Sequence, residues 1–278
     1  MMMKLSYTTL AVQDRTIEEA VRIAGHYGLD GIELRGRDRI HISPDCDFSY
    51  ISESRKMIRD YGLKIPCLTA YTKFRQVTAE DVYREVEELM PMIDLAEYLG
   101  AETVRVFMGA QPPGMTGRDS DQIAVAGLLR AAEAMAGSPV RLVIETHDSA
   151  KDGKTLARLL TDVPEQIGVL LDIIHPWDMG ESIEETWNLI GRRIHHVHIK
   201  DISETVAGGR IYSPIGAGIL PVEAIIACLN GNGYRGYYSL EWEPSAIPEK
   251  GIGFEEQMAS FVSFMRKQEG CGKHENPI

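Results

Sequence analysis

The segment VLLDIIHPW, at positions 169–177, begins with three apolar residues and then reaches Asp172. The segment RLVIE, at positions 141–145, has the same form and reaches Glu145. Apolar runs of this kind are typical of parallel strands covered on both faces, whereas strands with one wet face alternate. We therefore predict two parallel strands, each with a carboxylate at its C-terminal end.

The same pattern continues in both directions along the chain. The predicted strands are Leu5–Thr8, Gly31–Leu34, Ile65–Thr69, Thr103–Phe107, Leu142–Glu145, Gly168–Asp172, Ile194–Lys200 and Tyr237–Glu241. Helical periodicity is clearest between them at Thr16–Tyr27, Ala79–Leu99, Ser182–Ile190 and Pro221–Leu229. Eight strand–helix units in 278 residues predict an α/β fold, the (β/α)8 TIM barrel. The competing doubly wound sheet usually has a glycine-rich turn after its first strand, but the segment YTTLAVQD contains no glycine.

The composition is that of an ordinary globular protein, with 44% hydrophobic and 25% charged residues. No linker or compositional break divides the chain, so we predict one (β/α)8 domain over residues 1–278, with a flexible tail from about residue 268. The four cysteines show no C-x-x-C spacing, which favours free thiols in a reducing compartment.

Charge and hydrophobicity exclude some partners. The formal net charge of −12 repels a phosphate backbone, so we expect no nucleic acid partner. The start of the chain, MMMKLSYTTLAVQD, lacks the apolar core of a signal peptide. No apolar run approaches the roughly 18 residues that span a bilayer, so we expect a cytoplasmic protein without a membrane partner.

Four consecutive predicted strands carry metal-ligand residue types at their C-terminal ends, where TIM barrels place their active sites. These residues are Glu145, Asp172, His198 and Glu241. A polar residue at one strand end is ordinary, but all four at matching positions favour a functional cluster. Three carboxylates and one imidazole suit one divalent metal ion such as Mn, Co, Zn or Mg, which would also relieve the repulsion between the acids.

The motifs IETH, LDIIHPW, HVHIKD and SLEWE resemble the xylose isomerase-like superfamily, and the resemblance extends from the first strand to the last. That superfamily includes ketose 3-epimerases, inosose dehydratases, 3-dehydroshikimate dehydratases and endonuclease IV. The resemblance implies a TIM barrel in which Glu145, Asp172, His198 and Glu241 bind one divalent metal ion. Endonuclease IV has further histidines after its third and fourth strands. The segments PCLTAYTKF and VRVFMGAQP contain none, so a DNA-repair nuclease is not expected.

The resemblance to the epimerases also implies catalytic roles. Glu145 and Glu241 would remove and return a proton next to a ketone, while the metal stabilises the enediolate. His175 matches a family histidine that contacts a substrate oxygen. Lys200 lies two residues after His198 on the same strand face, so it either points into the pocket or pairs with Asp201.

Five further residues are candidate substrate contacts, each with an ordinary structural alternative. Glu33, His147, Trp177, Arg210 and Trp242 lie near predicted strand ends or in the loops that follow. Glu33 would reach a hydroxyl or pack against an arginine, and His147 has a loop role as its alternative. The two tryptophans would line the pocket or pack in the core. Arg210 lies further from His198 than the equivalent arginine of the epimerases.

Three functions remain open. The first is an isomerase or epimerase acting on a small polyhydroxy ketone, with or without a phosphate. The second is a metal-dependent dehydratase of the 3-dehydroshikimate or inosose type, in which His175 or Lys200 assists the departure of hydroxide. The third is a barrel that binds sugars without turnover. Analogy with other barrels also suggests a homodimer.

Overall fold

The computed structural model describes residues 2–37, 39–204, 209–243 and 251–271. Eight parallel strands form one sheet in the order β1-β10-β7-β6-β5-β4-β3-β2. The strands are β1 Lys4–Tyr7, β2 Leu34–Arg35, β3 Cys67–Lys73, β4 Thr103–Phe107, β5 Arg141–Glu145, β6 Ile167–Asp172, β7 Ile194–Ile199 and β10 Tyr237–Leu240. Where the two ends of this order meet, the Glu33 amide donates to the Tyr7 carbonyl and the Thr9 amide donates to the Glu33 carbonyl, both at 2.9 Å. These bonds join the end of β1 to the residue that precedes β2, as the predicted (β/α)8 barrel requires.

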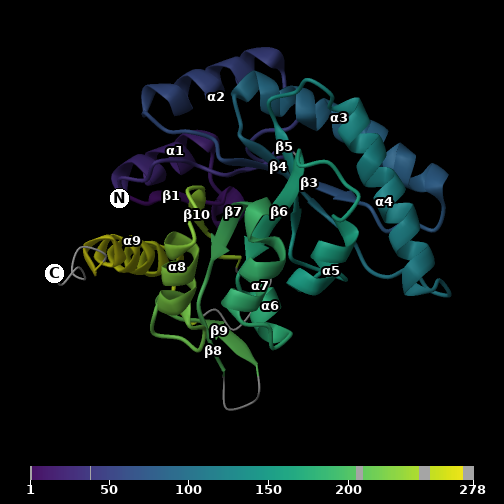
Figure 1. The fold of residues 1–278 in the computed structure, drawn as a ribbon. Coiled ribbons are helices and arrows are strands. Elements are labelled where there is room, and N and C mark those ends of the chain that lie inside the picture. The colour runs from purple at the N-terminus through teal and green to yellow at the C-terminus, as the bar shows by residue number, and fades with distance from the viewer. Residues whose placement is uncertain (1, 38, 205–208, 244–250, 272–278) are drawn as a thin grey trace.

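Helices alternate with the strands and cover the outside of the sheet (Figure 1). They are α1 Ile17–His26, α2 Phe48–Asp60, α3 Ala79–Leu99, α4 Gly117–Ala134, α5 Gly153–Leu159, α6 Ile174–Asp178, α7 Ile183–Ile190, α8 Val222–Gly231 and α9 Phe254–Cys271. The start of α1 is fixed by a capping box in which the side chains of Thr16 and Glu19 each accept from the other's backbone amide. Within the described ranges, none of the helices is long and apolar enough to cross a membrane.

Four short elements interrupt this alternation. The 3-10 helices are η1 Thr9–Val12 and η2 Gly191–Arg193. After β7, the strands β8 Ile202–Glu204 and β9 Arg210–Tyr212 pair antiparallel as a separate two-stranded sheet. This hairpin brings Arg210 and Tyr212 back to the end of the barrel at which β7 finishes, where both line a cavity.

Several boundaries differ from the sequence prediction by two residues or more, among them those of the third strand, which is Cys67–Lys73 and not the predicted Ile65–Thr69. The second strand is Leu34–Arg35 and therefore later than the predicted Gly31–Leu34, which is represented by single bridges at Gly31 and Glu33. Helix α9 continues to Cys271, past the predicted start of a tail at residue 268, and Arg266 ties it to the Met3 carbonyl at 3.0 Å. Residues 272–278 lie outside the described residues.

The register of the sheet places the four predicted metal ligands at one end of the barrel. Asp172 lies opposite His198 in the pairing of β6 with β7. Glu145 is the last residue of β5, and Glu241 directly follows the last residue of β10. Because parallel strands present their C-terminal ends at one rim, β5, β6, β7 and β10 deliver all four side chains to the same place.

Candidate active site

Three of the four predicted metal ligands lie within direct reach of one another. Three ligand atoms, one each from Glu145, His198 and Glu241, all lie within 4.8 Å of one another. His198 Nδ1 is 3.6 Å from Glu145 Oε1 and 3.1 Å from Glu241 Oε2. Asp172 joins this group through Lys200, whose Nζ is 2.8 Å from Asp172 Oδ2 and 2.5 Å from Glu241 Oε2. The structure therefore brings all four residues to one cluster.

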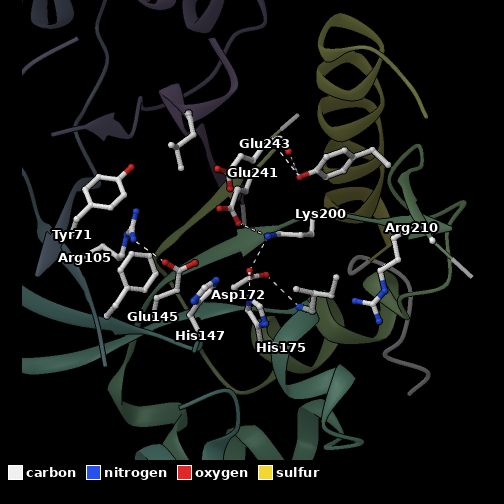
Figure 2. A pocket seen from close by; sticks show the side chains of 15 residues that line it. Tyr71, Arg105, Glu145, His147, Asp172, His175, Lys200, Arg210, Glu241 and Glu243 are labelled. Carbon is white, nitrogen blue, oxygen red and sulfur yellow. Dashed lines mark hydrogen bonds and ion pairs between the residues drawn. The ribbon is translucent and has the colours of Figure 1, made fainter. Parts of the chain in front are cut away.

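Glu145, Asp172 and Glu241 line a cavity of about 720 Å³ at the C-terminal end of the strands, whereas His198 is completely buried behind them (Figure 2). Charged and imidazole side chains dominate one part of its lining, and Leu10, Ile174 and aromatic rings provide the apolar part. The polar residues of the lining are Arg105, Glu145, His147, Asp172, His175, Lys200, Arg210, Glu241 and Glu243. The aromatic residues are Tyr71, Phe107 and Tyr212.

Charges at the floor of the cavity are paired. Burial alone would raise the pKa of Asp172, but Lys200 and His175 outweigh burial and lower it to about 2. Burial also opposes ionisation of Glu241, yet Lys200 and His198 hold its pKa well below the usual range. Conversely, burial would lower the pKa of Lys200, but Asp172 and Glu241 raise it well above its ordinary value. At neutral pH, both carboxylates are therefore anions and Lys200 is a cation.

Lys200 and His175 approach the same carboxylate from different elements. His175 Nε2, at the start of α6, is 3.2 Å from Asp172 Oδ2, to which Lys200 also donates. Of the two positions expected for Lys200, the structure shows the one in the pocket. Its neighbour Asp201 instead accepts backbone hydrogen bonds from Gly216, at 2.9 Å, and from Gly218, at 3.0 Å.

His147 and Arg210 also line the cavity. The His147 ring lies edge-on to His175, with 4.7 Å between centroids, and its Nδ1 is 2.9 Å from Asp148 Oδ1. Asp148 has a φ of 50°, a left-handed conformation that is uncommon outside glycine and turns the chain directly after the rim. Arg210 is held by two hydrogen bonds to Asp178, at 2.6 and 2.8 Å, which fix its guanidinium at the edge of the pocket.

Three of the predicted substrate contacts lie elsewhere. Glu33 is completely buried inside the barrel, beneath His198, so it cannot reach a ligand hydroxyl, and this corrects its predicted role. Trp177 lines a separate cavity of about 390 Å³ beside α7 and α8. Trp242 is buried, and its ring centroid lies 5.9 Å from those of both Tyr212 and Phe254. It therefore packs in the core and does not line the pocket.

Sequence reasoning missed Arg105, which lies in β4 and is almost completely buried. Its Nε is 3.3 Å from Glu145 Oε2, and its guanidinium lies over the Phe107 ring at 4.0 Å and the Tyr71 ring at 5.1 Å. Its Nη1 is buried and makes no hydrogen bond within the described part of the chain. The available signal was a charged residue in the middle of the apolar run TVRVF, since such a residue is rarely buried without a partner.

The donor set fits a divalent metal ion. The buried His198 Nδ1 has no hydrogen-bond partner within the described residues, although it lies 3.1 Å from Glu241 Oε2. One imidazole nitrogen and carboxylate oxygens are ligands that Zn and Mn accept. A bound cation would compete with Lys200 for the oxygens of Asp172 and Glu241, because the ammonium group now neutralises both.

Comparisons with known proteins agree with this geometry. Fructoselysine 3-epimerase from Shigella flexneri is 22% identical over 280 residues, covering 96% of this chain and all of that protein. The 3-dehydroshikimate dehydratase from Bacillus anthracis is 22% identical over 264 residues, covering 86% of this chain and 91% of that protein. A solved structure of the IOLI protein with a bound zinc atom matches with a TM-score of 0.77 at 18% identity, covering 99% of this chain and all of that one. At such identity the structural match establishes the fold alone.

A family match decides the classification. The family model described as xylose isomerase-like TIM barrel matches residues 21–266, from the first helix of the barrel to the last. The match includes the C-terminal ends of β5, β6, β7 and β10, where the acidic and histidine side chains gather. With its closed parallel sheet and this rim cluster, the chain belongs to the xylose isomerase-like TIM barrel family.

Proposed function

We propose that the protein is a divalent-metal-dependent isomerase or epimerase that transfers a proton next to the carbonyl of a small polyhydroxy ketone. The observation that carries the proposal is the pair Glu145 and Glu241. Both line one cavity, both approach His198 Nδ1, and each has its own cation: Arg105 beside Glu145 and Lys200 beside Glu241. The name of the fructoselysine 3-epimerase relative supports the same reaction class.

The residues that would hold the ion are Glu145, Asp172, His198 and Glu241. The ion would supply a positive charge that stabilises the negative charge developing on the ketone oxygen. A carboxylate that remains ionised at neutral pH can accept the carbon-bound proton, and the lowered pKa of Glu241 keeps it in that form. Glu145, on β5, is placed to return a proton, and the order of the two depends on the handedness of the substrate.

His175 and Lys200 would bind the substrate oxygens. Both line the cavity and both donate toward Asp172 Oδ2, so a ligand oxygen placed there would meet two polarised N–H groups. Burial opposes the charge on His175, but Asp172 outweighs burial and raises the pKa of the imidazole, which favours its protonated form. These two groups would hold the ketose while the glutamates exchange the proton.

A dehydratase is the second candidate, and the same two groups are the observation that favours it. Removing water from a β-hydroxy ketone breaks one C–H bond and one C–O bond, so the leaving hydroxide needs a proton. A glutamate would take the carbon-bound proton, and the protonated His175 or Lys200 would give a proton to the departing oxygen, releasing water. The 3-dehydroshikimate dehydratase relative carries out a reaction of that name.

The test combines metal analysis with isotope exchange. The purified chain, reconstituted in turn with Mn, Co, Zn and Mg, is incubated in D₂O with keto-sugars and cyclic ketones. One ion per chain and deuterium in a recovered ketose would support the isomerase or epimerase. Water loss with a new ultraviolet chromophore would favour the dehydratase instead. Ligand-induced stabilisation without any exchange would indicate a binding protein, and failure to retain any ion would overturn the shared mechanism. Trp177→Phe, outside the pocket, is the control variant.

A further inference from the structure

Glu33 occupies a buried position that the proposed reaction does not use. Its carboxylate is surrounded by donors: Ser239 Oγ donates to Oε2 at 2.8 Å, and His196 Nε2 lies 2.8 Å from the same oxygen. His198 Nε2 lies 3.0 Å from Oε1 and 3.1 Å from Oε2. All four side chains are at most 1% exposed, so water does not compete for these contacts. Glu33 thus connects the rim residue His198 to Ser239 and to His196.

The sheet register explains why these groups converge. His196 and His198 are two residues apart on β7, so they point to the same face of the strand. Ser239 lies opposite His198 on β10, and the bridge between Thr8 and Glu33 fixes the height of Glu33 in the barrel. The contacts therefore follow from strand positions and do not depend on a surface loop.

The contacts of Glu33 determine which nitrogen of His198 carries hydrogen. The Glu33 carboxylate accepts from Ser239 Oγ, and both of its oxygens lie within hydrogen-bond distance of His198 Nε2. A carboxylate in this setting accepts hydrogen bonds, so His198 donates from Nε2. In a neutral imidazole, Nδ1 then has a free lone pair, and Nδ1 is the atom that faces Glu145 and Glu241.

We propose that Glu33 is a positioning residue that holds His198 as the Nε2–H tautomer and thereby presents Nδ1 to a divalent ion at the rim. Ser239 and His196 hold Glu33 in place for this task. The inference rests on the proposed function, because it requires a metal ion bound at the rim of the barrel. Partners that orient a metal-binding histidine typically change metal affinity by about 10- to 100-fold when mutated.

The main test is Glu33→Gln, which keeps the shape of the side chain but replaces one acceptor with an amide donor. The glutamine has one acceptor oxygen with two lone pairs for three donors, Ser239, His196 and His198, so we expect Zn²⁺ to bind about 10- to 100-fold more weakly in a competition titration with a chelating dye. In zinc-loaded protein with ¹⁵N-labelled histidine, the unaltered chain should bind through Nδ1 of His198 and keep hydrogen on Nε2. In Glu33→Gln, the form of His198 with hydrogen on Nε2 should no longer be the only one observed.

Two further variants separate positioning from simple disruption of the core. Cys67→Ala removes a completely buried side chain within 4.8 Å of the Glu33 and His196 ligand atoms, but it leaves every contact described above. It should retain the zinc affinity of the unaltered chain. Ser239→Ala removes one donor to Glu33 and should weaken zinc binding about threefold to tenfold, which provides a test even if Glu33→Gln does not fold.

The outcomes distinguish this inference from the proposed function. If the unaltered chain binds no zinc after reconstitution, both the proposed function and this inference are overturned. If it binds zinc and Glu33→Gln binds equally well with the same nitrogen signature, only the positioning role is wrong. An equal loss of affinity in Cys67→Ala would attribute the effect to core packing and would also overturn the inference.

Discussion

Two groups of ligand-type side chains lie inside this barrel and differ in what they can do. The rim group is Glu145, His198 and Glu241, and the inner group is Glu33, Cys67 and His196; each meets the same distance requirement for holding an ion. The two glutamates of the rim group line the large cavity, whereas every member of the inner group is at most 1% exposed. Proximity alone therefore does not distinguish a metal site from a structural network.

Hydrogen bonding accounts for the difference. The inner carboxylate of Glu33 already accepts from Ser239 and contacts two histidines, so its oxygens have partners. Burial also raises the pKa of the Cys67 thiol, and a thiol that keeps its proton is a poor metal ligand. In the rim group, by contrast, Glu145 and Glu241 line the cavity, and His198 Nδ1 lies 3.6 Å from the first and 3.1 Å from the second. Access from the cavity, rather than residue type, distinguishes the rim group as the candidate site.

The largest expected effect of a single substitution is the loss of turnover in Glu145→Gln. The amide keeps an oxygen for a metal ion but cannot take up a proton, so turnover should fall by at least about 10²- to 10⁴-fold while the ion is held more loosely. Deuterium uptake into the ketone measures the first effect and bound metal per chain measures the second. Full activity in this variant would remove Glu145 from the mechanism.

The next prediction compares the two groups directly by metal binding. Glu241→Gln removes a charged ligand of the rim group and should weaken metal binding by more than about 100-fold, since even outer partners cost 10- to 100-fold. Cys67→Ala, in the inner group, should still bind one ion per chain. Metal analysis after dialysis measures both. Two ions in the unaltered chain, with one lost in Cys67→Ala, would show that the inner group is also a metal site.

The third prediction concerns the charges that support the rim group. Arg105→Met keeps the length of the side chain but leaves Glu145 buried without its cation, so we expect the free energy of unfolding to fall by about 3 kcal/mol. The matched control is Arg130→Met, which breaks an exposed pair with Glu133 and should cost less than about 1 kcal/mol. Urea denaturation of the metal-free proteins measures both. Equal losses would mean that the buried pair of Arg105 and Glu145 stabilises the fold no more than an exposed pair does.

The sequence predicts the rim better than the interior, and Glu33 shows why. Strand ends can be found from apolar runs, and Asp172 and Glu145 end their strands as predicted. The second strand was predicted to end at Leu34, which placed Glu33 near the rim, but β2 continues to Arg35 and Glu33 lies lower in the barrel. A shift of one or two residues in an uncertain strand boundary is enough to move a carboxylate from the pocket to the core.

Arg105 illustrates the other limit. Its position in the middle of a strand gives no indication of which partner neutralises it, because Glu145 belongs to the next strand and 40 residues separate them in the sequence. The pairing of β4 with β5 places Arg105 opposite Val143, two residues before Glu145, and so brings the two charges together. Such a contact depends on strand register, which a single sequence does not specify.

The smallest expected effect concerns His195, which lies on β7 beside the two inward histidines but is only partly buried. Burial, with Arg141 and Arg193 nearby, lowers the pKa of this imidazole to about 4. An unfolded histidine titrates near 6.5, so between pH 6.5 and 4 the unfolded chain binds the proton and the folded chain does not. The folded state therefore loses stability as the pH falls through this window.

Partial exposure reduces the size of this loss, and we expect about 1–2 kcal/mol from His195. His195→Gln should remove this contribution and show a flatter dependence of the unfolding free energy on pH between 6.5 and 4. His26→Gln, on the exposed end of α1, is the control and should follow the unaltered chain. If His195→Gln also follows the unaltered chain, the outward histidine of β7 is uncoupled from folding. The acid sensitivity of the barrel would then lie with groups other than His195.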